Sequence, residues 1–307
     1  MTVVLSALAP VVLLIALGYG LRRSGLAPDA SWPPVERLTY FVLFPALLVS
    51  RISAQGVPSG LAVAAAVTVI TVLAVAGLLL VLRPAFRRLT GPTYTALFQG
   101  GVRFNTYLSF AMAEGLLGPA ALAPLAWLAA VMIVLINVLC VLAFARWGAG
   151  KTAPSLGGVF KALGTNPLIL ACLLGGVLAA QPQALPTAVA DALALLGSAA
   201  LPLGLLAVGA ALRAPRQATE LQPLVASSVV QFAVKPALAL GLAAALAVPA
   251  PLQGVLLMLF CVPTATSAYI LAQQLGGDGP ATAAVITGQT LLALAVTPLL
   301  LATFLAV

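Results

Sequence analysis

Long continuous apolar stretches, separated by short polar connections, run along the whole chain. Each stretch extends over about 20 residues, which is the length that a helix needs to cross the hydrocarbon core of a bilayer. The apolar positions are continuous and do not alternate, so they favour membrane-spanning helices over the strands of a barrel. The pattern predicts an all-α polytopic membrane protein with ten spans, at residues 3–21, 35–53, 61–82, 93–116, 121–144, 164–180, 187–212, 221–248, 252–275 and 281–306.

The composition agrees with this pattern. Hydrophobic residues make up 63% of the chain and charged residues only 7%. A soluble protein of this length could not cover its surface with so few charges, so we expect a multi-pass membrane protein. The longest polar connection, at about residues 145–163, joins two halves. We therefore divide the chain into residues 1–148, a connection at residues 149–163, and residues 164–307.

The two halves share one plan. Three helix-breaking residues recur 157 residues later, and a Leu-Phe pair with a following tyrosine recurs 162 residues later. Pro45 and Pro202, which form one of these pairs, lie mid-span and are expected to kink their helices. An internal repeat in a membrane chain is typical of secondary transporters. The matched positions are Pro10 and Pro167, Gly18 and Gly175, Pro45 and Pro202, Leu97-Phe98 and Leu259-Phe260, and Tyr107 and Tyr269.

The basic residues predict the orientation of the chain in the membrane. Of the 14 lysines and arginines, eleven lie beside odd-numbered connections and only Arg51 lies beside an even-numbered one. The positive-inside rule then places the odd connections in the cytoplasm and both termini outside the cell membrane. With five spans in each half, the second half must insert upside down relative to the first, which predicts two inverted five-helix repeats. The eleven residues are Arg22, Arg23, Arg37, Arg83, Arg87, Arg88, Arg146, Lys151, Lys161, Arg213 and Arg216.

Several classes of function are excluded by what the chain lacks. Histidine is absent, which removes the commonest proton shuttle and metal ligand. Cys140, Cys172 and Cys261 all lie in apolar spans, so we interpret them as packing residues. There is no phosphate-binding loop and no Ser-His-acid set, so we expect neither an enzyme nor a bound cofactor or metal. The net charge of +8 reflects the topology and does not indicate nucleic-acid binding.

The polar residues inside spans four and nine carry the candidate chemistry. Each span contains a helix breaker, Gly101 or Pro263, followed by hydroxyl or amide side chains. Broken backbone at membrane depth is tolerated only where it is buried in protein or lines a cavity, and matched breaks in two repeats mark a transport site. We therefore predict that spans four and nine break and cross beside a substrate. The candidate substrate-binding residues are Gly101, Arg103, Asn105, Thr106, Pro263, Thr264, Thr266, Ser267 and Asn137.

Other polar residues in the spans allow two interpretations each. Arg103 could anchor a substrate carboxylate, or could brace the loosened carbonyls of its own broken helix. Asn137 and Gln289 could line the cavity or form helix-packing contacts. Glu114, Asn137 and Gln289 are the conspicuous oxygen donors for a coupling cation, with Glu114 and Gln289 as the possible coupling residues, although Glu114 could instead face the headgroups. Lys235 could form an internal ion pair or extend its amine to the membrane surface.

The motifs of the two predicted breaks resemble a known family. The segments Arg103-Phe104-Asn105-Thr106-Tyr107 and Pro263-Thr264-Ala265-Thr266-Ser267-Ala268-Tyr269, with Gly18-Tyr19 early in the chain, are similar to bacterial members of the auxin efflux carrier family. The resemblance implies a scaffold of spans one, two, six and seven beside a mobile transport domain of spans three to five and eight to ten. It also implies the fold of bile-acid sodium symporters. Plant members carry proline where this chain has Gly101, and they have a longer central loop, so the resemblance does not single out auxin as the substrate.

We expect a secondary transporter that moves a small organic anion, an auxin-like acid or a dicarboxylate, across the cell membrane by alternating access. The N-termini of the two half-helices after the breaks would favour a carboxylate. The alternatives are a cation-coupled symporter of another small solute, a channel, and a membrane enzyme or accessory protein. The expected partners are a small organic acid, the lipid bilayer and a second copy of the chain, which would pair through small residues of spans two and seven.

Overall fold

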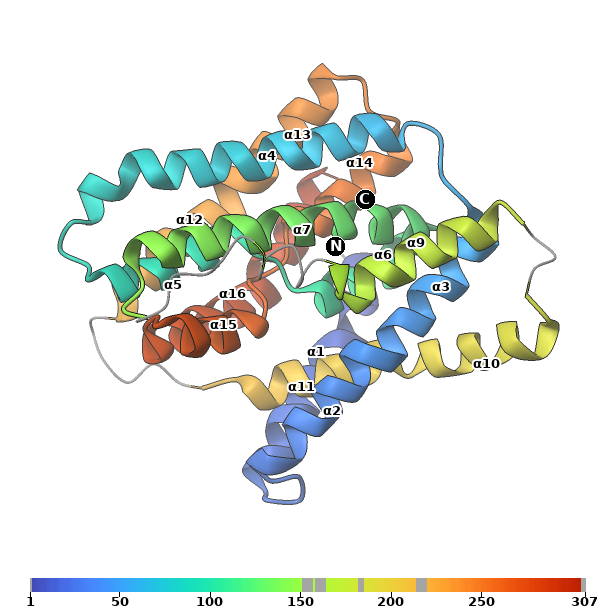
Figure 1. Ribbon diagram of the computed structural model, residues 1–307, viewed down its shortest axis with the longest axis horizontal. Helices are drawn as coiled ribbons and strands as arrows, with labels where there is room; N and C mark the ends of the chain where they lie inside the picture. Colours follow the sequence, from blue (N-terminus) through green and yellow to red (C-terminus); the bar gives the residue numbers. More distant parts are fainter. Residues whose placement is uncertain (1, 151–156, 158–163, 182–184, 214–219, 305–307) are drawn as a thin grey trace.

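The computed structural model describes residues 2–150, 157, 164–181, 185–213 and 220–304 (Figure 1). This part of the chain is helical and contains no strand, so the predicted all-helical fold is confirmed. Most of the predicted central connection lies outside the described residues. The helices of the first half are α1 (Thr2–Arg23), α2 (Trp32–Leu38), α3 (Phe44–Gln55), α4 (Leu61–Leu82), α5 (Gly91–Val102), α6 (Thr106–Leu117) and α7 (Leu122–Trp147).

The second half continues with shorter helices before a long terminal one. They are α9 (Pro167–Ala179), α10 (Thr187–Ser198), α11 (Ala200–Ala211), α12 (Leu221–Val229), α13 (Lys235–Ala245), α14 (Ala250–Phe260), α15 (Ser267–Leu275) and α16 (Gly279–Phe304).

Seven helical segments of the described chain are long and apolar enough to cross a membrane, and they correspond to predicted spans one, two, three, five, seven, eight and ten. The other three predicted spans contain shorter helices. Span six is the 13-residue helix α9. Spans four and nine are each divided in two, as α5 with α6 and as α14 with α15. Both interruptions lie at the motifs that predicted them.

Prolines explain the other irregular points. A proline ring clashes with the carbonyl four residues before it, and a wider turn relieves the clash. Pro45 is preceded by a π-helical turn at Thr39–Leu43, and Pro236 by another at Val230–Val234. Near Pro202 the helix is interrupted between α10 and α11. The expected kinks at Pro45 and Pro202 therefore appear as a π turn and a helix break.

Helices of the two halves pack closely against each other, α1 against α11 and α3 against α9 (Figure 1). Glycines permit this approach. A Cβ atom at Gly18 would overlap the carbonyl oxygen of Leu206. A Cβ atom at Gly175 would lie 2.9 Å from the Cβ of Ile52 and 3.4 Å from the Cα of Val49. The hydrophobic effect does not drive association of helices inside the bilayer, so close packing through small residues stabilises such contacts.

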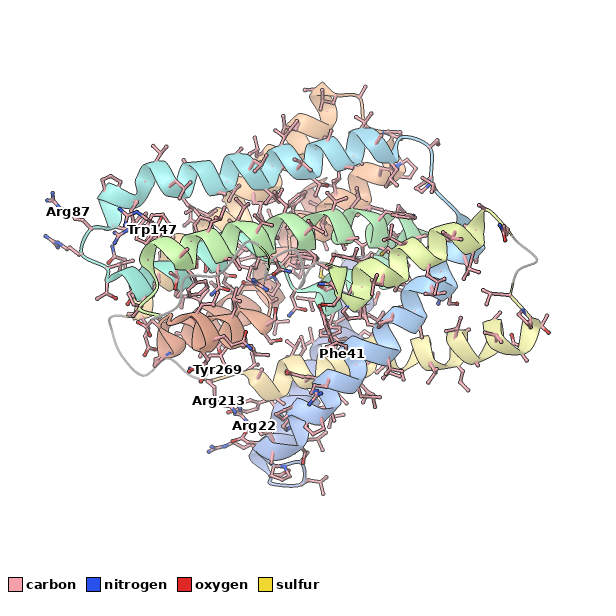
Figure 2. The ribbon with its side chains drawn as sticks, in the orientation of Figure 1. Arg22, Phe41, Arg87, Trp147, Arg213 and Tyr269 are labelled. Carbon is pink, nitrogen blue, oxygen red and sulfur yellow. The ribbon has the colours of Figure 1, made fainter. Side chains whose placement is uncertain are left out.

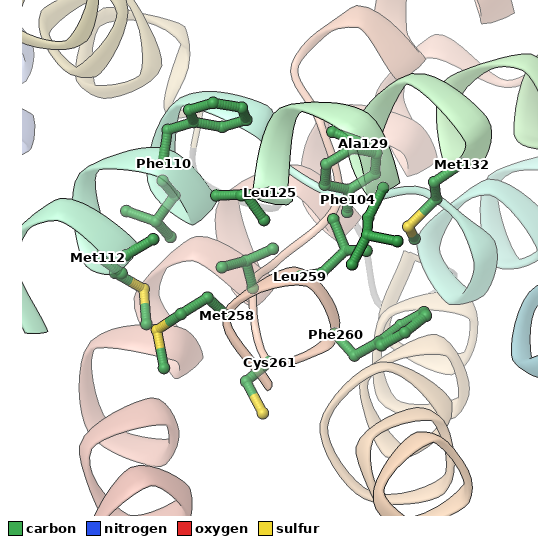
Figure 3. Close-up of a cluster of buried hydrophobic side chains, with 14 of the residues drawn as sticks. Phe104, Phe110, Met112, Leu125, Ala129, Met132, Met258, Leu259, Phe260 and Cys261 are labelled. Atoms are coloured by element: carbon green, nitrogen blue, oxygen red, sulfur yellow. The ribbon is translucent and has the colours of Figure 1, made fainter. Parts of the chain in front are cut away.

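The remaining long helices form a second group, in which α5 packs against α7, α12 and α16, and α4 packs against α7 and α13. Figure 3 shows the apolar side chains that fill the space between α6, α7 and α14, among them Phe110, Leu125 and Met258. The three cysteines are buried free thiols, which agrees with their predicted packing role. Two segments of irregular backbone lie inside this group, and they form the candidate site.

Candidate functional site at the crossing of two broken helices

The two interruptions contact each other. The first is residues 103–105, between α5 and α6, and the second is residues 261–266, between α14 and α15. The backbone amide of Asn105 donates a hydrogen bond of 2.8 Å to the carbonyl of Pro263. We call these two segments together the crossing. The N-termini of α6 and α15, and the C-termini of α5 and α14, all lie beside it.

Neutral side chains replace the backbone hydrogen bonds that are lost where the helices unwind. The side-chain oxygen of Gln289, on α16, accepts a bond of 2.9 Å from the amide of Thr264. The nitrogen of the same side chain donates to the carbonyl of Gly100 at 3.0 Å and to the hydroxyl of Ser227 at 3.1 Å. Thr264 in turn donates its hydroxyl to the carbonyl of Gln99 at 3.2 Å. Buried polar groups need such partners, so Gln289 joins the last turn of α5 to the second unwound segment.

Three other polar side chains hold the ends of the half-helices. Asn105 is the N-cap of α6, and its side-chain oxygen accepts from the amide of Leu108 at 3.1 Å. Ser109 donates to the carbonyl of Met258 at 2.9 Å, near the end of α14. Thr297 donates to the carbonyl of Cys261 at 3.0 Å. The crossing is therefore a well-bonded backbone arrangement, with its polar groups largely used for structure.

Two side chains at the crossing are exceptions: Gln99, whose side-chain oxygen is buried without a partner, and Arg103. Arg103 is the charged one. Its side chain is 9% exposed, and Nη2 donates to the hydroxyl of Ser267 at 3.1 Å. Nη1 is buried and has no hydrogen-bond partner. The brace interpretation expected the guanidinium to bond loosened carbonyls, but its neighbours are side chains: the hydroxyl of Ser267 at the start of α15 and the buried thiol of Cys140 on α7. Because Ser267 is exposed, this end of the guanidinium lies next to an open face of the helix.

Lys235 lies at the start of α13 and is completely buried. Its Nζ donates to the carbonyl of Arg103 at 3.0 Å and to the side-chain oxygen of Gln231 at 2.6 Å. The side-chain nitrogen of Gln231 donates to the carbonyl of Val262 in the second break. Both sequence interpretations of Lys235 are wrong: the amine neither pairs with a carboxylate nor extends to the membrane surface. A backbone carbonyl far away in the sequence is its partner instead.

The structure places the remaining candidate residues as follows. Gly101 lies in the last turn of α5, where a Cβ would come within 2.9 Å of Leu79, so the glycine serves close packing. Thr106 and Thr266 are half-buried at the N-termini of α6 and α15. Asn137 is half-buried on α7, and the hydrogen bonds of the crossing do not include it.

Glu114 lies near the far end of α6, away from the crossing. It forms an ion pair with Arg51 at 3.4 Å, and the two side chains are 36% and 37% exposed. Arg51 is the one basic residue that lies beside an even-numbered connection. Its ion pair with Glu114 gives this positive charge a partner. The side-chain oxygens of the two predicted coupling residues therefore have other partners. Glu114 pairs with Arg51, and Gln289 accepts from the amide of Thr264.

Sequence reasoning missed two amides and one hydroxyl that bond the crossing: Gln99, Gln231 and Ser227. Gln99 donates to the carbonyl of Ala268 at 3.3 Å. Single glutamines in long apolar spans were the available signal, because burying an amide is costly without a partner. Gln231 also lies four residues before Lys235, a spacing that brings the two side chains to one helix face.

The electrostatics of the crossing favour an anion. In the described part of the chain, its hydrogen bonds involve two cationic side chains, Arg103 and Lys235, and no carboxylate. The N-termini of α6 and α15 add partial positive charge and the C-termini of α5 and α14 add partial negative charge, so the two cationic side chains decide the balance. The part of the chain that the structure describes contains no group of three His, Cys, Asp or Glu side chains that could bind a metal ion.

Comparison with known families agrees with the predicted resemblance. The family model described as membrane transport protein matches residues 152–301. This match to the auxin efflux carrier and membrane transport family covers slightly less than half of the chain, and within these residues it confirms the resemblance. No curated protein matches the chain. The apolar helices and the match to a family of transporters together support a multi-pass membrane transporter.

Proposed function

We propose that the protein is a secondary transporter that moves a small organic anion across the cell membrane by alternating access. The observation that carries the proposal is the Arg103 guanidinium, buried at the crossing with Nη1 unpaired. A buried donor without an acceptor costs about 1–3 kcal/mol, and more when it is charged. A substrate carboxylate would supply the acceptor.

The chemistry of this position suits a carboxylate. A guanidinium presents parallel N–H groups that match the two oxygens of a carboxylate. Helix N-termini attract anions, and those of α6 and α15 begin at Thr106 and Ser267. A monocarboxylate of the auxin type and a dicarboxylate both fit this chemistry, and neutral hydroxyls of Thr266 and Ser267 would bond the rest of the molecule.

The contacts between the halves support the proposed arrangement of ten spans as two inverted repeats. Gly18 packs against Leu206, and Gly175 packs against Val49. The two contacts are equivalent in the repeat. Gly175 lies 157 residues after Gly18, and Leu206 lies 157 residues after Val49. Reciprocal contacts of this kind are expected from a two-fold axis in the membrane plane. In this arrangement ten spans result from the seven long apolar segments together with α9 and the two broken helices.

The packing also supports two moving parts. We assign α1, α2, α3, α9, α10 and α11 to a scaffold, and α4 to α7 with α12 to α16 to a transport domain. The crossing lies wholly within the transport domain, so a movement of this domain against the scaffold would carry the bound anion with it.

Equivalent tyrosines of the two repeats have different surroundings. Tyr107, on α6, packs edge-on against Phe44 with ring centroids 5.4 Å apart, and a Cβ at Gly204 would overlap its ring. Tyr269, on α15, is 42% exposed and lies toward the end of the molecule that carries Arg213 (Figure 2). α6 packs against scaffold helices α1 and α11, whereas the main packing partners of α15 are α5, α7 and α16. We infer that this conformation is closed to the scaffold at α6 and open at α15, on the side predicted to be cytoplasmic.

Paired cysteines test the alternating movement. A Cβ at Gly115 would lie 3.8 Å from the Cβ of Ala7, which suits a disulfide between α6 and α1. The repeat makes Gly164 and Gly277 the equivalent pair at the other side. In a background without native cysteines, we expect the Ala7–Gly115 pair to cross-link and block transport. The Gly164–Gly277 pair should cross-link in the opposite state only, so the yield of each pair should fall as the other rises. Simultaneous formation of both disulfides in one molecule would contradict alternating access.

A homodimer through small residues of span seven remains a prediction. Three glycines of this span contact helices of the same chain: Gly197 lies against Leu47, Gly204 against Tyr107, and Gly209 against Ile15. These glycines are therefore occupied within the protomer, and a dimer would have to use other side chains.

A further inference from the structure

Lys235 and Gln231 together reach the unwound backbone of both broken helices. The lysine bonds the carbonyl of Arg103, and the glutamine bonds the carbonyl of Val262. The two side chains also bond each other. They come from span eight, which is not one of the broken helices.

The environment of the lysine amine is unusual. A buried cation is costly unless an opposite charge or several oxygens stabilise it. In the described residues no carboxylate lies within ion-pair distance of Lys235. Its partners are an amide oxygen and the carbonyl of Arg103, which is the C-cap residue of α5. The C-terminal end of a helix carries partial negative charge, so these oxygens form a position that attracts a cation.

Discontinuous membrane helices use such positions in a recurrent way. Carbonyls of unwound backbone and the C-terminal ends of half-helices coordinate the small cation that is cotransported with the substrate. The carbonyl of Arg103 belongs to both classes, because it lies in the break and immediately after α5. In this chain a side-chain amine already binds it.

We propose that the amine of Lys235 takes the place of a coupling cation such as Na⁺ at the crossing. The carrier then needs no Na⁺ at this position. The inference rests on the proposed function, since it concerns the coupling of the same site. It also explains how a crossing with two cationic side chains and no bonded carboxylate can remain buried, because the carbonyl ends of the broken helices balance the lysine.

The test uses purified full-length protein and thermal unfolding in NaCl, KCl or choline chloride at equal ionic strength. Wild type should show the same Tm in all three salts. Lys235→Ala should have a lower Tm in choline, and Na⁺ should raise it by roughly 2–4 °C, because a ligand that binds the folded state stabilises it. Lys235→Ser, which leaves a further oxygen in the cavity, is the second variant and should respond in the same direction.

Leu256→Ala is the matched control. Leu256 is fully buried on α14 in an apolar setting, so its truncation should lower Tm without making the protein sensitive to Na⁺. Equal Tm values for Lys235→Ala in Na⁺ and choline would overturn the proposal and leave Lys235 as a structural brace only.

Transport by wild type gives an arm that needs no variant to fold. Initial uptake of a labelled carboxylate into proteoliposomes should be unchanged when choline replaces Na⁺ on both sides. A tenfold or greater loss of uptake in choline would overturn the proposal. If wild type transports no carboxylate at all, the proposed function fails, whereas the Na⁺ response of the Lys235 variants still decides the present inference.

Discussion

Arg103→Gln is the substitution that most sharply separates the anion carrier from other transporters. The change removes the guanidinium and its charge, but the backbone carbonyl that Lys235 bonds is kept. Glutamine keeps a polar amide but is two bonds shorter, so the bond to Ser267 is lost together with the charge. The variant therefore removes the proposed anchor while disturbing the bonded backbone of the crossing as little as the chain allows.

The expected magnitude follows from the unpaired donor. A hydrogen bond to a charged group contributes about 1.5–3 kcal/mol, and every 1.4 kcal/mol is about tenfold in affinity. Arg103→Gln should therefore weaken binding of an ionised acid by roughly 10–100-fold. Binding of the matching amide, which has the same shape but no charge, should change little. The preference of wild type for the acid should disappear in the variant.

A competition assay with a carboxylate and its amide, in wild type and Arg103→Gln, measures this preference. Arg51→Gln is the matched control, because Arg51 is an arginine of an exposed ion pair away from the crossing. It should leave both affinities unchanged. Equal binding of acid and amide by wild type would refute the anion site. A large loss of Tm in Arg103→Gln with the preference retained would show that Arg103 acts as a brace.

Further predictions concern packing, the crossing and the topology. Gly18→Ala should lower stability by about 1–3 kcal/mol because its methyl group overlaps a carbonyl of α11, whereas Gly20→Ala, with open space around it, should not; thermal unfolding compares the two. Gln289→Leu orphans the amide of Thr264 and the carbonyl of Gly100, so it should destabilise the protein by about 1–3 kcal/mol, while Asn137→Leu on α7 should have a smaller effect on Tm. Single cysteines at Ser24 and Ala120, in connections one and four, should react with impermeant reagents from opposite sides of the membrane, and labelling from one side would contradict the orientation given by the positive charges.

The helices and their breaks were predictable because they depend on local composition. The predicted span at residues 61–82 coincides with α4 (Leu61–Leu82), since a run of apolar residues between Gly60 and Arg83 leaves little ambiguity. The breaks followed from Gly101 and Pro263, which weaken a helix wherever they occur. The family resemblance rested on the same two motifs and on Gly18-Tyr19 early in the chain.

The partners of the buried polar groups were not predictable, because they depend on contacts between distant segments. Lys235 bonds a carbonyl at Arg103, and no spacing rule relates these two positions. The pairing of Glu114 with Arg51 likewise joins different spans, so each looked isolated in the sequence. The unpaired nitrogen of Arg103, on which the proposed function depends, is visible only once its surroundings are known.

The central claim is that this protein carries an ionised organic acid through a saturable, alternating site. Counterflow tests it directly: proteoliposomes loaded with unlabelled indole-3-acetate or malate are diluted into a trace of the same labelled acid. We predict a transient accumulation of label above equilibrium with at least one of the two acids, and its loss in Arg103→Gln. Uptake that merely equilibrates without overshoot and does not saturate with either acid would contradict the carrier, and would favour a channel.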